Sequence, residues 1–274
     1  MAGVFFDGHS FQEYIVLKDC PYCHDSVNFT EVAENPRTAR CNVCGLYRLY
    51  PRINCQGQRV MLKKYNDEQL DQANFGEPLE HIKYFRGEIK KLKQVFPSVF
   101  PNGRVLDVGC GDGSFLAALK AVGAVATGVE PCEKFSQFGN QHGLDIKHGR
   151  FEAEGMPSGL EESSFDLICF RESIYYMPDL HETFDILNTY LRPGGGIYIK
   201  CHVATSWYYS LNNDYSSRYS YSVAGMPTRK ALTHMLTHEG YRIRKIGYSF
   251  LSVNFYAQVY SKLSKNPYIL KTFA

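Results

Sequence analysis

From Arg104 onward, short apolar runs alternate with segments whose apolar residues recur every three or four positions. Such runs are typical of buried strands, and the periodic segments predict amphipathic helices. The predicted strands are 104–108, 125–129, 145–148, 165–170 and 195–201, and the predicted helices are 114–122, 132–141, 180–191 and 228–239. This alternation predicts an α/β domain with a doubly wound, mostly parallel sheet. Two further β-rich runs, 241–250 and 252–261, predict an antiparallel hairpin at the sheet edge because a short link joins them.

Upstream of this domain the pattern changes twice. Apolar residues at positions 82, 85, 89, 92 and 96 predict an amphipathic helix over 78–96 that ends before Pro97, and its lysines are expected to form a solvated face. Residues 46–77 show no clear period and are interpreted as a connector with a short helix around Asp67–Ala73. The chain is therefore divided into an N-terminal module (1–60), a connector with the amphipathic helix (61–100) and the α/β domain (101–274).

The composition fits an ordinary globular protein. The chain has 274 residues, of which 44% are hydrophobic, enough for about two folded domains and too much for a disordered chain. A formal net charge of +2 argues against a nucleic-acid clamp and against a membrane-surface protein. No apolar run approaches the roughly 18 residues of a membrane span, and residues 1–17 do not resemble a signal peptide. We expect a cytoplasmic protein with reduced cysteines and no membrane partner.

Four of the nine cysteines form two pairs with two-residue spacing, Cys20-Pro-Tyr-Cys23 and Cys41-Asn-Val-Cys44. Two such turns place four thiolates around one ion, so the pattern predicts a structural Zn²⁺ site in a zinc-ribbon-like module. Two alternatives remain open, a pair of turns that folds without metal and a redox pair. The other five cysteines are expected to be small reduced apolar residues, or in one case part of a glycine loop.

That glycine loop follows the first strand of the α/β domain. Gly109, Gly111 and Gly113 let the backbone turn sharply and let a ligand approach closely. The carboxylates of Asp107 and Asp112 would repel a pyrophosphate and attract a ligand that carries an ammonium and a sulfonium group. Glu130 ends the second strand, where a carboxylate can bind both ribose hydroxyls. Together these features predict S-adenosylmethionine as the cofactor.

The chain resembles the class I S-adenosylmethionine-dependent methyltransferases over about residues 104–260. The resemblance rests on Leu106-Asp-Val-Gly-Cys-Gly-Asp-Gly113, Gly128-Val-Glu-Pro131, Phe165-Asp-Leu-Ile168 and Leu191-Arg-Pro-Gly-Gly-Gly196. It implies a Rossmann-like, mostly parallel seven-stranded sheet with an antiparallel C-terminal hairpin. It also implies cofactor-binding roles: the glycine loop with Asp107 at the methionine end, Glu130 at the ribose, Arg150 and Phe151 at the adenine, and Arg171 and Glu172 near the sulfonium.

Upstream residues extend the resemblance to a bacterial subgroup with an N-terminal zinc ribbon. They are the two cysteine pairs, the stretch Cys44-Gly-Leu-Tyr-Arg-Leu-Tyr-Pro-Arg52, and Tyr65. The later Met226-Pro-Thr-Arg-Lys230 also fits this subgroup. Members are common in sugar, surface-polysaccharide and natural-product pathways. The resemblance therefore implies a sugar, a nucleotide-linked sugar or a natural-product intermediate as the methyl acceptor.

The sequence departs from many relatives where a catalytic base is expected. Many relatives carry a Glu-His pair where this chain has Tyr175 and Tyr176. A tyrosine is a poor base unless its pKa falls from about 10, although it can orient or stack on a substrate. His202, just past the fifth strand, is the preferred base, with Glu172 as the alternative. Residues 207–221 hold the only tryptophan and five tyrosines, and they are expected to cover the acceptor pocket.

Three functions from different classes follow. The leading hypothesis is methyl transfer to a small molecule, with the zinc module closing one wall of the acceptor pocket or supporting a homodimer. The second is an RNA methyltransferase whose zinc module grips RNA, which the near-neutral charge disfavours. The third is a zinc-binding adaptor without turnover, which the absent Glu-His pair keeps open.

Overall fold

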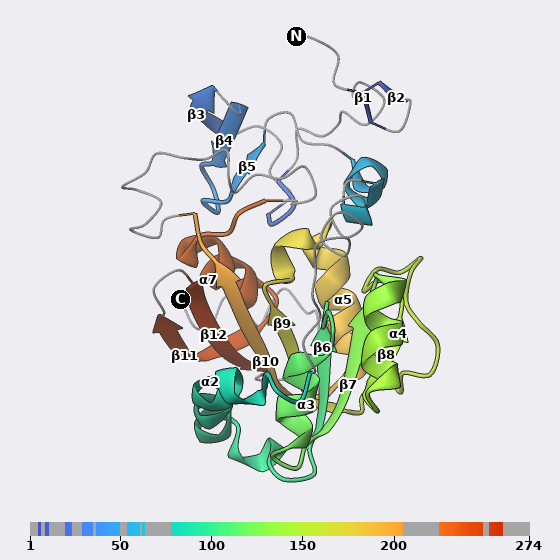
Figure 1. The fold of residues 1–274 in the computed structure, drawn as a ribbon. Helices are drawn as coiled ribbons and strands as arrows, with labels where there is room; N and C mark the ends of the chain where they lie inside the picture. The colour runs from blue at the N-terminus through green and yellow to red at the C-terminus, as the bar shows by residue number, and fades with distance from the viewer. Residues whose placement is uncertain are drawn as a thin grey trace.

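The computed structural model describes residues 5–6, 9–10, 20–23, 29–34, 37–49, 54–60, 62–63, 78–204, 225–248 and 252–259. A seven-stranded sheet lies at the centre of the molecule, in the order β11-β12-β10-β9-β6-β7-β8 (Figure 1). Its strands are β6 (Arg104–Val108), β7 (Val125–Glu130), β8 (Asp145–His148), β9 (Phe165–Arg171), β10 (Leu191–His202), β11 (Tyr241–Tyr248) and β12 (Ser252–Val259). The five strands from β10 to β8 are parallel, and β12 is antiparallel to both of its neighbours. The predicted mostly parallel, Rossmann-like architecture is confirmed.

Helices cover both faces of the sheet. They are α2 (Ile82–Val95), α3 (Ser114–Lys120), α4 (Glu133–Gln141), α5 (Leu180–Tyr190) and α7 (Arg229–His238), with short 3-10 turns η2 (Pro97–Val99) and η3 (Ile174–Tyr176). Successive residues of β9 point to opposite faces, as the pleat of a strand requires. Ile168 and Phe170 pack in the core with α5 and α7, whereas Leu167 and Cys169 pack in the core with α2 and α3.

The N-terminal module is a three-stranded antiparallel sheet, β3 (Phe29–Glu34), β4 (Arg37–Cys41) and β5 (Tyr47–Leu49), preceded by the short pair β1 (Phe5–Phe6) and β2 (His9–Ser10). Figure 1 shows β3, β4 and β5 above the upper edge of the central sheet. Two backbone hydrogen bonds join Tyr47 and Met226, at 3.1 and 2.7 Å, and Leu180 N donates to Pro21 O at 3.3 Å. The module is thus fastened to the starts of α5 and α7.

Two local predictions differ from the structure, and a third is not tested by it. Residues 55–60 and 62–63 are helical, although the sequence analysis interprets them as part of a connector without a clear period. The helix predicted around Asp67–Ala73 lies outside the described residues. The fifth strand is predicted over 195–201, but β10 already begins at Leu191, with an irregular register between Leu191 and Gly196. Gly196 is needed there because a Cβ would lie 2.4 Å from the Phe96 ring.

Candidate functional site

The glycine loop leaves β6 and leads into α3. Gly109, Gly111 and Gly113 all have positive φ, a region that favours glycine. A Cβ on Gly109 would lie 2.8 Å from the Ser173 Cβ, whereas a Cβ on Gly111 would meet no atom within 4 Å. Gly111 therefore faces open space, and a ligand could approach its backbone closely.

Glu130 anchors the loop to the end of β7. Its side chain is 5% exposed, and its carboxylate accepts hydrogen bonds from Gly111 N at 2.8 Å and Cys132 N at 2.9 Å. Burial raises the pKa of Glu130, and the two backbone N–H groups partly oppose that shift. Glu130, the residue predicted to bind the ribose, is therefore held rigidly beside the glycine loop.

Two adjoining cavities open at this edge of the sheet. The inner one has a volume of about 200 Å³, and its walls include Gly109, Gly111, Glu130, Phe151 and Glu172. The outer one has a volume of about 480 Å³. Both cavities share Leu62, Pro131, Arg150, Glu152 and Tyr176. The structure thus brings most of the predicted cofactor residues to one continuous hollow.

The helical residues 55–60 and 62–63 lie against the outer cavity, a feature that the sequence did not predict. Cys55, Gln58, Arg59 and Leu62 line the cavity. Gln58 Nε2 donates to Tyr176 O at 2.8 Å, and Arg59 Nε donates to Glu152 Oε2 at 3.0 Å. These residues recur at helical spacing but mix polar with apolar side chains, so hydrophobic periodicity alone gives no signal.

Glu172 lies immediately after β9, on the wall of the inner cavity. Its Oε2 accepts hydrogen bonds from His202 N at 3.0 Å and from Tyr175 Oη at 3.3 Å, and His202 Nε2 lies 3.7 Å from the same oxygen. Burial raises the pKa of Glu172, and His202 opposes that shift. The structure therefore brings three predicted catalytic residues together around one carboxylate oxygen.

The two tyrosines differ in position. Tyr175 is nearly buried, and burial raises the pKa of its phenol. At neutral pH Tyr175 is therefore a hydrogen-bond donor to Glu172. Tyr176 lines both cavities, and its ring centroid lies 4.7 Å from that of Tyr175. Of the two, Tyr176 is the one that can contact a ligand.

Arg171 and Gly113 do not line either cavity. Arg171 points to the opposite face of β9, where its guanidinium lies 4.2 Å from the Phe115 ring centroid and its Nε lies 2.6 Å from Glu88 Oε1. Lys200 Nζ lies 2.9 Å from Glu88 Oε2. A Cβ on Gly113 would lie 2.5 Å from Leu144 Cδ1 and 2.9 Å from Ile146 Cδ1, so this glycine lets the loop pack on β8 and the residue before it. The sequence analysis did not single out Glu88, which forms ion pairs with both Arg171 and Lys200. The signal that could have found it is an acidic residue next to the apolar positions of α2.

Asp107 lies beneath the loop and is almost fully buried. Burial raises the pKa of Asp107 to about 7, and the positive charge of Arg171 opposes this shift. Its Oδ1 has no hydrogen-bond partner among the described residues. Asp107 therefore contributes a buried carboxyl close to the glycine loop without lining the cavities.

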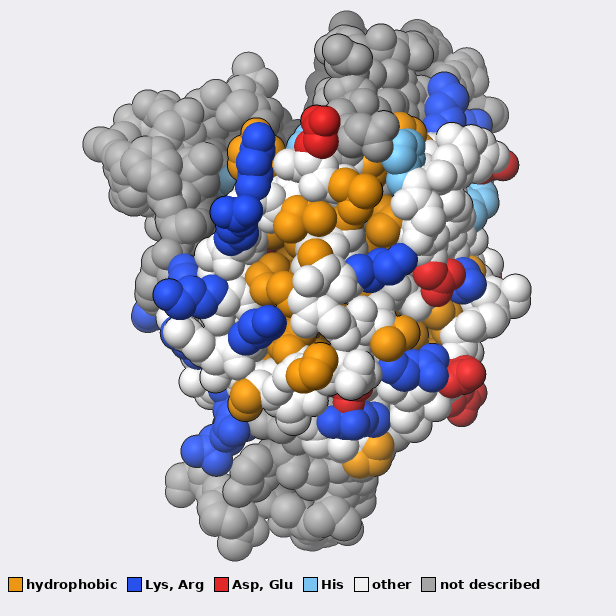
Figure 2. Space-filling model, turned by 60° about the horizontal axis from the view of Figure 1, so that its bottom comes forward, with side chains coloured by type: hydrophobic (Ala, Val, Ile, Leu, Met, Phe, Trp, Pro, Cys, Tyr) orange, Lys and Arg blue, Asp and Glu red, His pale blue; other side chains and the backbone are white. Residues whose placement is uncertain are grey.

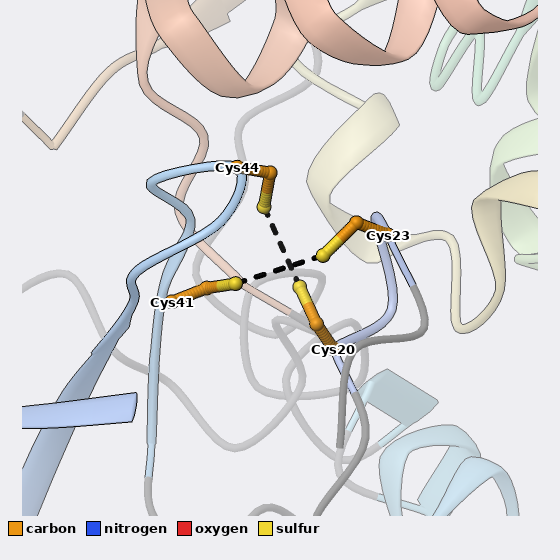
Figure 3. Close-up of side chains that lie close together, drawn as sticks. All are labelled: Cys20, Cys23, Cys41 and Cys44. Atoms are coloured by element: carbon orange, nitrogen blue, oxygen red, sulfur yellow. Dashed lines mark hydrogen bonds between the residues drawn. The ribbon is translucent and has the colours of Figure 1, made fainter. Parts of the chain in front are cut away.

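The four paired cysteines converge in the N-terminal module (Figure 3). The Sγ atoms of Cys20 and Cys44 are 3.6 Å apart, as are those of Cys23 and Cys41. A disulfide needs about 2.05 Å between sulfurs, whereas a tetrahedral zinc site with Zn–S bonds of about 2.3 Å needs about 3.8 Å. The hydrogen bond between Cys20 and Cys44 lowers the pKa of Cys20 to about 5 and raises that of Cys44, so this pair shares one proton. The donor set and its spacing fit a zinc ion.

Other predictions concern the surface and residues 207–221. Residues 207–221, predicted to cover the acceptor pocket, lie outside the described residues. No helix in the described part of the chain is long and apolar enough to cross a membrane. Lys90, Lys91 and Lys93 are exposed, as predicted. Figure 2 shows the basic side chains of its face dispersed among apolar ones instead of gathered in one tract.

Comparison with known proteins points to one family. Residues 79–246 match the family described as a methyltransferase domain. The ubiquinone biosynthesis O-methyltransferase of Albidiferax ferrireducens is 23% identical over 152 residues, which cover 50% of this chain and 60% of that protein. The corresponding protein of Paracidovorax citrulli is 31% identical over 102 residues, which cover 35% of this chain and 42% of that protein. The chain thus spans about 60% or less of these curated relatives.

Solved structures share the fold. A S-adenosylmethionine-dependent methyltransferase from Mesorhizobium loti has a TM-score of 0.51 at 17% identity, covering 62% of this chain and 97% of that one. One from Thermotoga maritima has a TM-score of 0.50 at 18% identity, covering 66% of this chain and 99% of that one. At these identities the likeness establishes the fold alone.

Proposed function

The chain belongs to the methyltransferase-domain family, and from this premise we propose that it transfers the methyl group of S-adenosylmethionine to a small-molecule acceptor. The observation that carries the proposal is the hollow formed by the glycine loop and Glu130. Gly111 leaves its backbone accessible there, and the carboxylate of Glu130 is fixed at the rim by two backbone hydrogen bonds. Anionic groups and close backbone approach suit a ribose and a cationic amino-acid tail.

The residues of the hollow can divide the binding of this cofactor among them. Glu130 would accept hydrogen bonds from the ribose hydroxyls, and Gly109 and Gly111 would lie against the methionine part. Phe151 and Arg150 would contact the adenine, since both line the cavity beyond Glu130. When bound, S-adenosylmethionine supplies a methyl group that the sulfonium already activates for transfer.

The chain itself must align the acceptor and remove its proton. Glu172 is the best-placed base, because it lines the inner cavity and burial raises its pKa toward neutrality. Tyr175 and the His202 backbone N–H both donate to its Oε2, so they would fix the orientation of the carboxylate. His202 is the alternative base, since its ring lies beside the same oxygen.

A small acceptor is favoured by the dimensions of the hollow. The two cavities, of about 480 and 200 Å³, lie in the range of small-molecule sites. Several curated relatives are named as O-methyltransferases of ubiquinone biosynthesis, which supports a small molecule rather than a macromolecule as the acceptor. The subgroup resemblance suggests a sugar, a nucleotide-linked sugar or a natural-product intermediate.

The four cysteines would hold a structural zinc ion. Cys20, Cys23, Cys41 and Cys44 present four sulfurs with the spacing of a closed tetrahedral site, and such sites contribute directly to folding. The ion would hold the two turns together and thereby keep the module on the edge of the central sheet.

Cofactor binding is tested by calorimetry with S-adenosylmethionine and S-adenosylhomocysteine. Gly111→Asn should abolish binding, because asparagine tolerates positive φ and its side chain would enter the hollow. Gly143→Asn is the matched control, since Gly143 also has positive φ and open space but lies in an exposed turn away from the hollow. A wild-type protein that binds neither compound would refute the proposal.

The acceptor class is tested by transfer of a labelled methyl group. Label should enter a fraction of small sugars, nucleotide sugars or other metabolites from a cell extract. Label in RNA would instead support the RNA alternative, and cofactor binding without label in any fraction would support the adaptor alternative.

A further inference from the structure

A second cluster of metal-binding side chains lies where α5 and α7 meet. Glu239 Oε1 lies 2.9 Å from His181 Nδ1 and 3.3 Å from His238 Nδ1. The three ligand atoms all lie within 4.8 Å of one another. None of these residues lines the two cavities of the candidate site, so the cluster is separate from the proposed methyl-transfer site.

The three side chains come from two helices that are packed together. His181 is the second residue of α5, and His238 and Glu239 end α7 just before β11. The ring of Tyr241 packs on Phe184 of α5 with centroids 5.5 Å apart, and its hydroxyl donates to Asn188 Oδ1. The start of β11, two residues after Glu239, is therefore fixed to α5 by a buried contact next to the cluster.

The spacing of the ligand atoms agrees with one shared cation. In a tetrahedral site with bonds of about 2.0–2.1 Å to nitrogen and oxygen, neighbouring ligand atoms lie about 3.3 Å apart. The two measured separations of 2.9 and 3.3 Å are close to that edge. Two imidazoles and one carboxylate are a ligand set that suits zinc and the neighbouring divalent transition metals.

The electrostatics of the position also favour a cation. The cluster lies at the carboxyl end of α7, where the helix dipole attracts positive charge, and the carboxylate of Glu239 outweighs the opposing dipole at the amino end of α5. His234, one turn earlier on α7, stacks on the ring of His238 with an interplanar angle of 8°. His238 is 63% exposed at its side chain, so water could complete the coordination.

We propose that His181, His238 and Glu239 form a second metal site, which binds a divalent transition cation such as Zn²⁺ and ties the start of α5 to the end of α7. Leu180, next to His181, also donates a backbone hydrogen bond to Pro21 of the N-terminal module. The cation would therefore reinforce the part of the domain on which that module is seated. The proposal does not depend on methyl transfer.

The test is a titration of Zn²⁺ into the full chain, prepared without a polyhistidine tag and already carrying one zinc per chain. We expect one further equivalent to bind, and His181→Ala and His238→Ala each to weaken this binding at least about tenfold. Thr237→Ala, an exposed neighbour on α7, should bind as the wild type does. Co²⁺ in this site should lack the thiolate charge-transfer bands that a four-cysteine site gives.

A second readout is thermal unfolding with and without added Zn²⁺. Saturating metal should raise the midpoint of the wild type by roughly 5 °C and leave His181→Ala and His238→Ala unchanged. A zinc-loaded wild type that takes up no further metal would overturn the proposal. Equal loss of binding in Thr237→Ala would overturn it too, since the effect would then not depend on the ligands.

Discussion

Glu172 has a backbone conformation that few residues other than glycine adopt. Its φ is +55°, and its N–H donates to Lys200 O at 2.7 Å, which holds the residue at the end of β9. A left-handed conformation at a non-glycine residue costs of the order of 1 kcal/mol and is concentrated at functional sites. The strain aims the carboxylate at His202 and the inner cavity, which is the position a general base requires.

Replacement of this carboxylate separates catalysis from cofactor binding. Glu172→Gln keeps the size of the side chain but removes the base, so methyl transfer should fall about 100-fold or more. The affinity for S-adenosylmethionine should change little, because Glu130 and the glycine loop are intact. The measurements are labelled methyl transfer and calorimetry, with the exposed Glu162→Gln as control. Full activity in Glu172→Gln would exclude Glu172 as the base.

The same carboxylate sets the direction of the pH dependence. A base acts when deprotonated, so activity falls as the pH drops through its pKa, which burial raises above the ordinary value. His202 lowers that pKa, and His202→Asn should therefore move the acidic limb of the profile to higher pH. A limb that moves to lower pH, or that persists unchanged in Glu172→Gln, would contradict this assignment.

The sequence predicts which residues lie at the candidate site better than it predicts which partners their side chains contact. Glu172, Tyr175 and His202 could be named because they follow strands whose ends meet in this fold. That Tyr175 donates to Glu172, and that Arg171 turns away to pair with Glu88, depends on the pleat and on a partner 83 residues distant. No local pattern contains that information.

The helical segment formed by residues 55–60 and 62–63 is the element that the sequence analysis missed. Gly57 lowers its helix propensity, and the face that lines the outer cavity joins Cys55 and Leu62 to the polar Gln58 and Arg59. Strands and helices of the α/β domain were predictable because each buries an apolar face. This segment instead packs through hydrogen bonds to Tyr176 and Glu152, which leave no periodic trace.

A single hydrogen bond tests whether this segment closes the site. Gln58→Ala removes the bond to Tyr176 O and leaves that carbonyl without this donor, which costs about 1–2 kcal/mol. If the segment must be in place for binding, the affinity for S-adenosylmethionine should fall by about 5- to 30-fold. Gln56→Ala, on the exposed side of the same segment, is the matched control. Calorimetry that finds equal affinities for both variants would separate the segment from cofactor binding.

At the scale of the whole molecule, the N-terminal module and the α/β domain follow one another along the chain, but they do not have separate cores. Cys20, Tyr22, Cys44 and Leu46 are buried in the same core as α5 and α7. The sequence could predict two units from the change of pattern near residue 60, but it could not predict that their apolar surfaces merge. Since a shared core couples the stabilities of the elements around it, loss of the module should affect the whole chain.

Removal of the proposed structural zinc measures this coupling. Cys41→Ser should bind one zinc ion fewer than the wild type, because Cys41 Sγ is one of four sulfurs about the same point. Without the ion, the three remaining thiolates would repel one another until they take up protons, and the two turns would separate from the core they share with α5 and α7. The thermal midpoint should then fall by at least about 5 °C in one transition. Cys55→Ser, which changes a cysteine outside the cluster, should retain its zinc. A Cys41→Ser protein that lost its zinc but unfolded at the wild-type temperature would show that the cysteine module adds no stability to the domain.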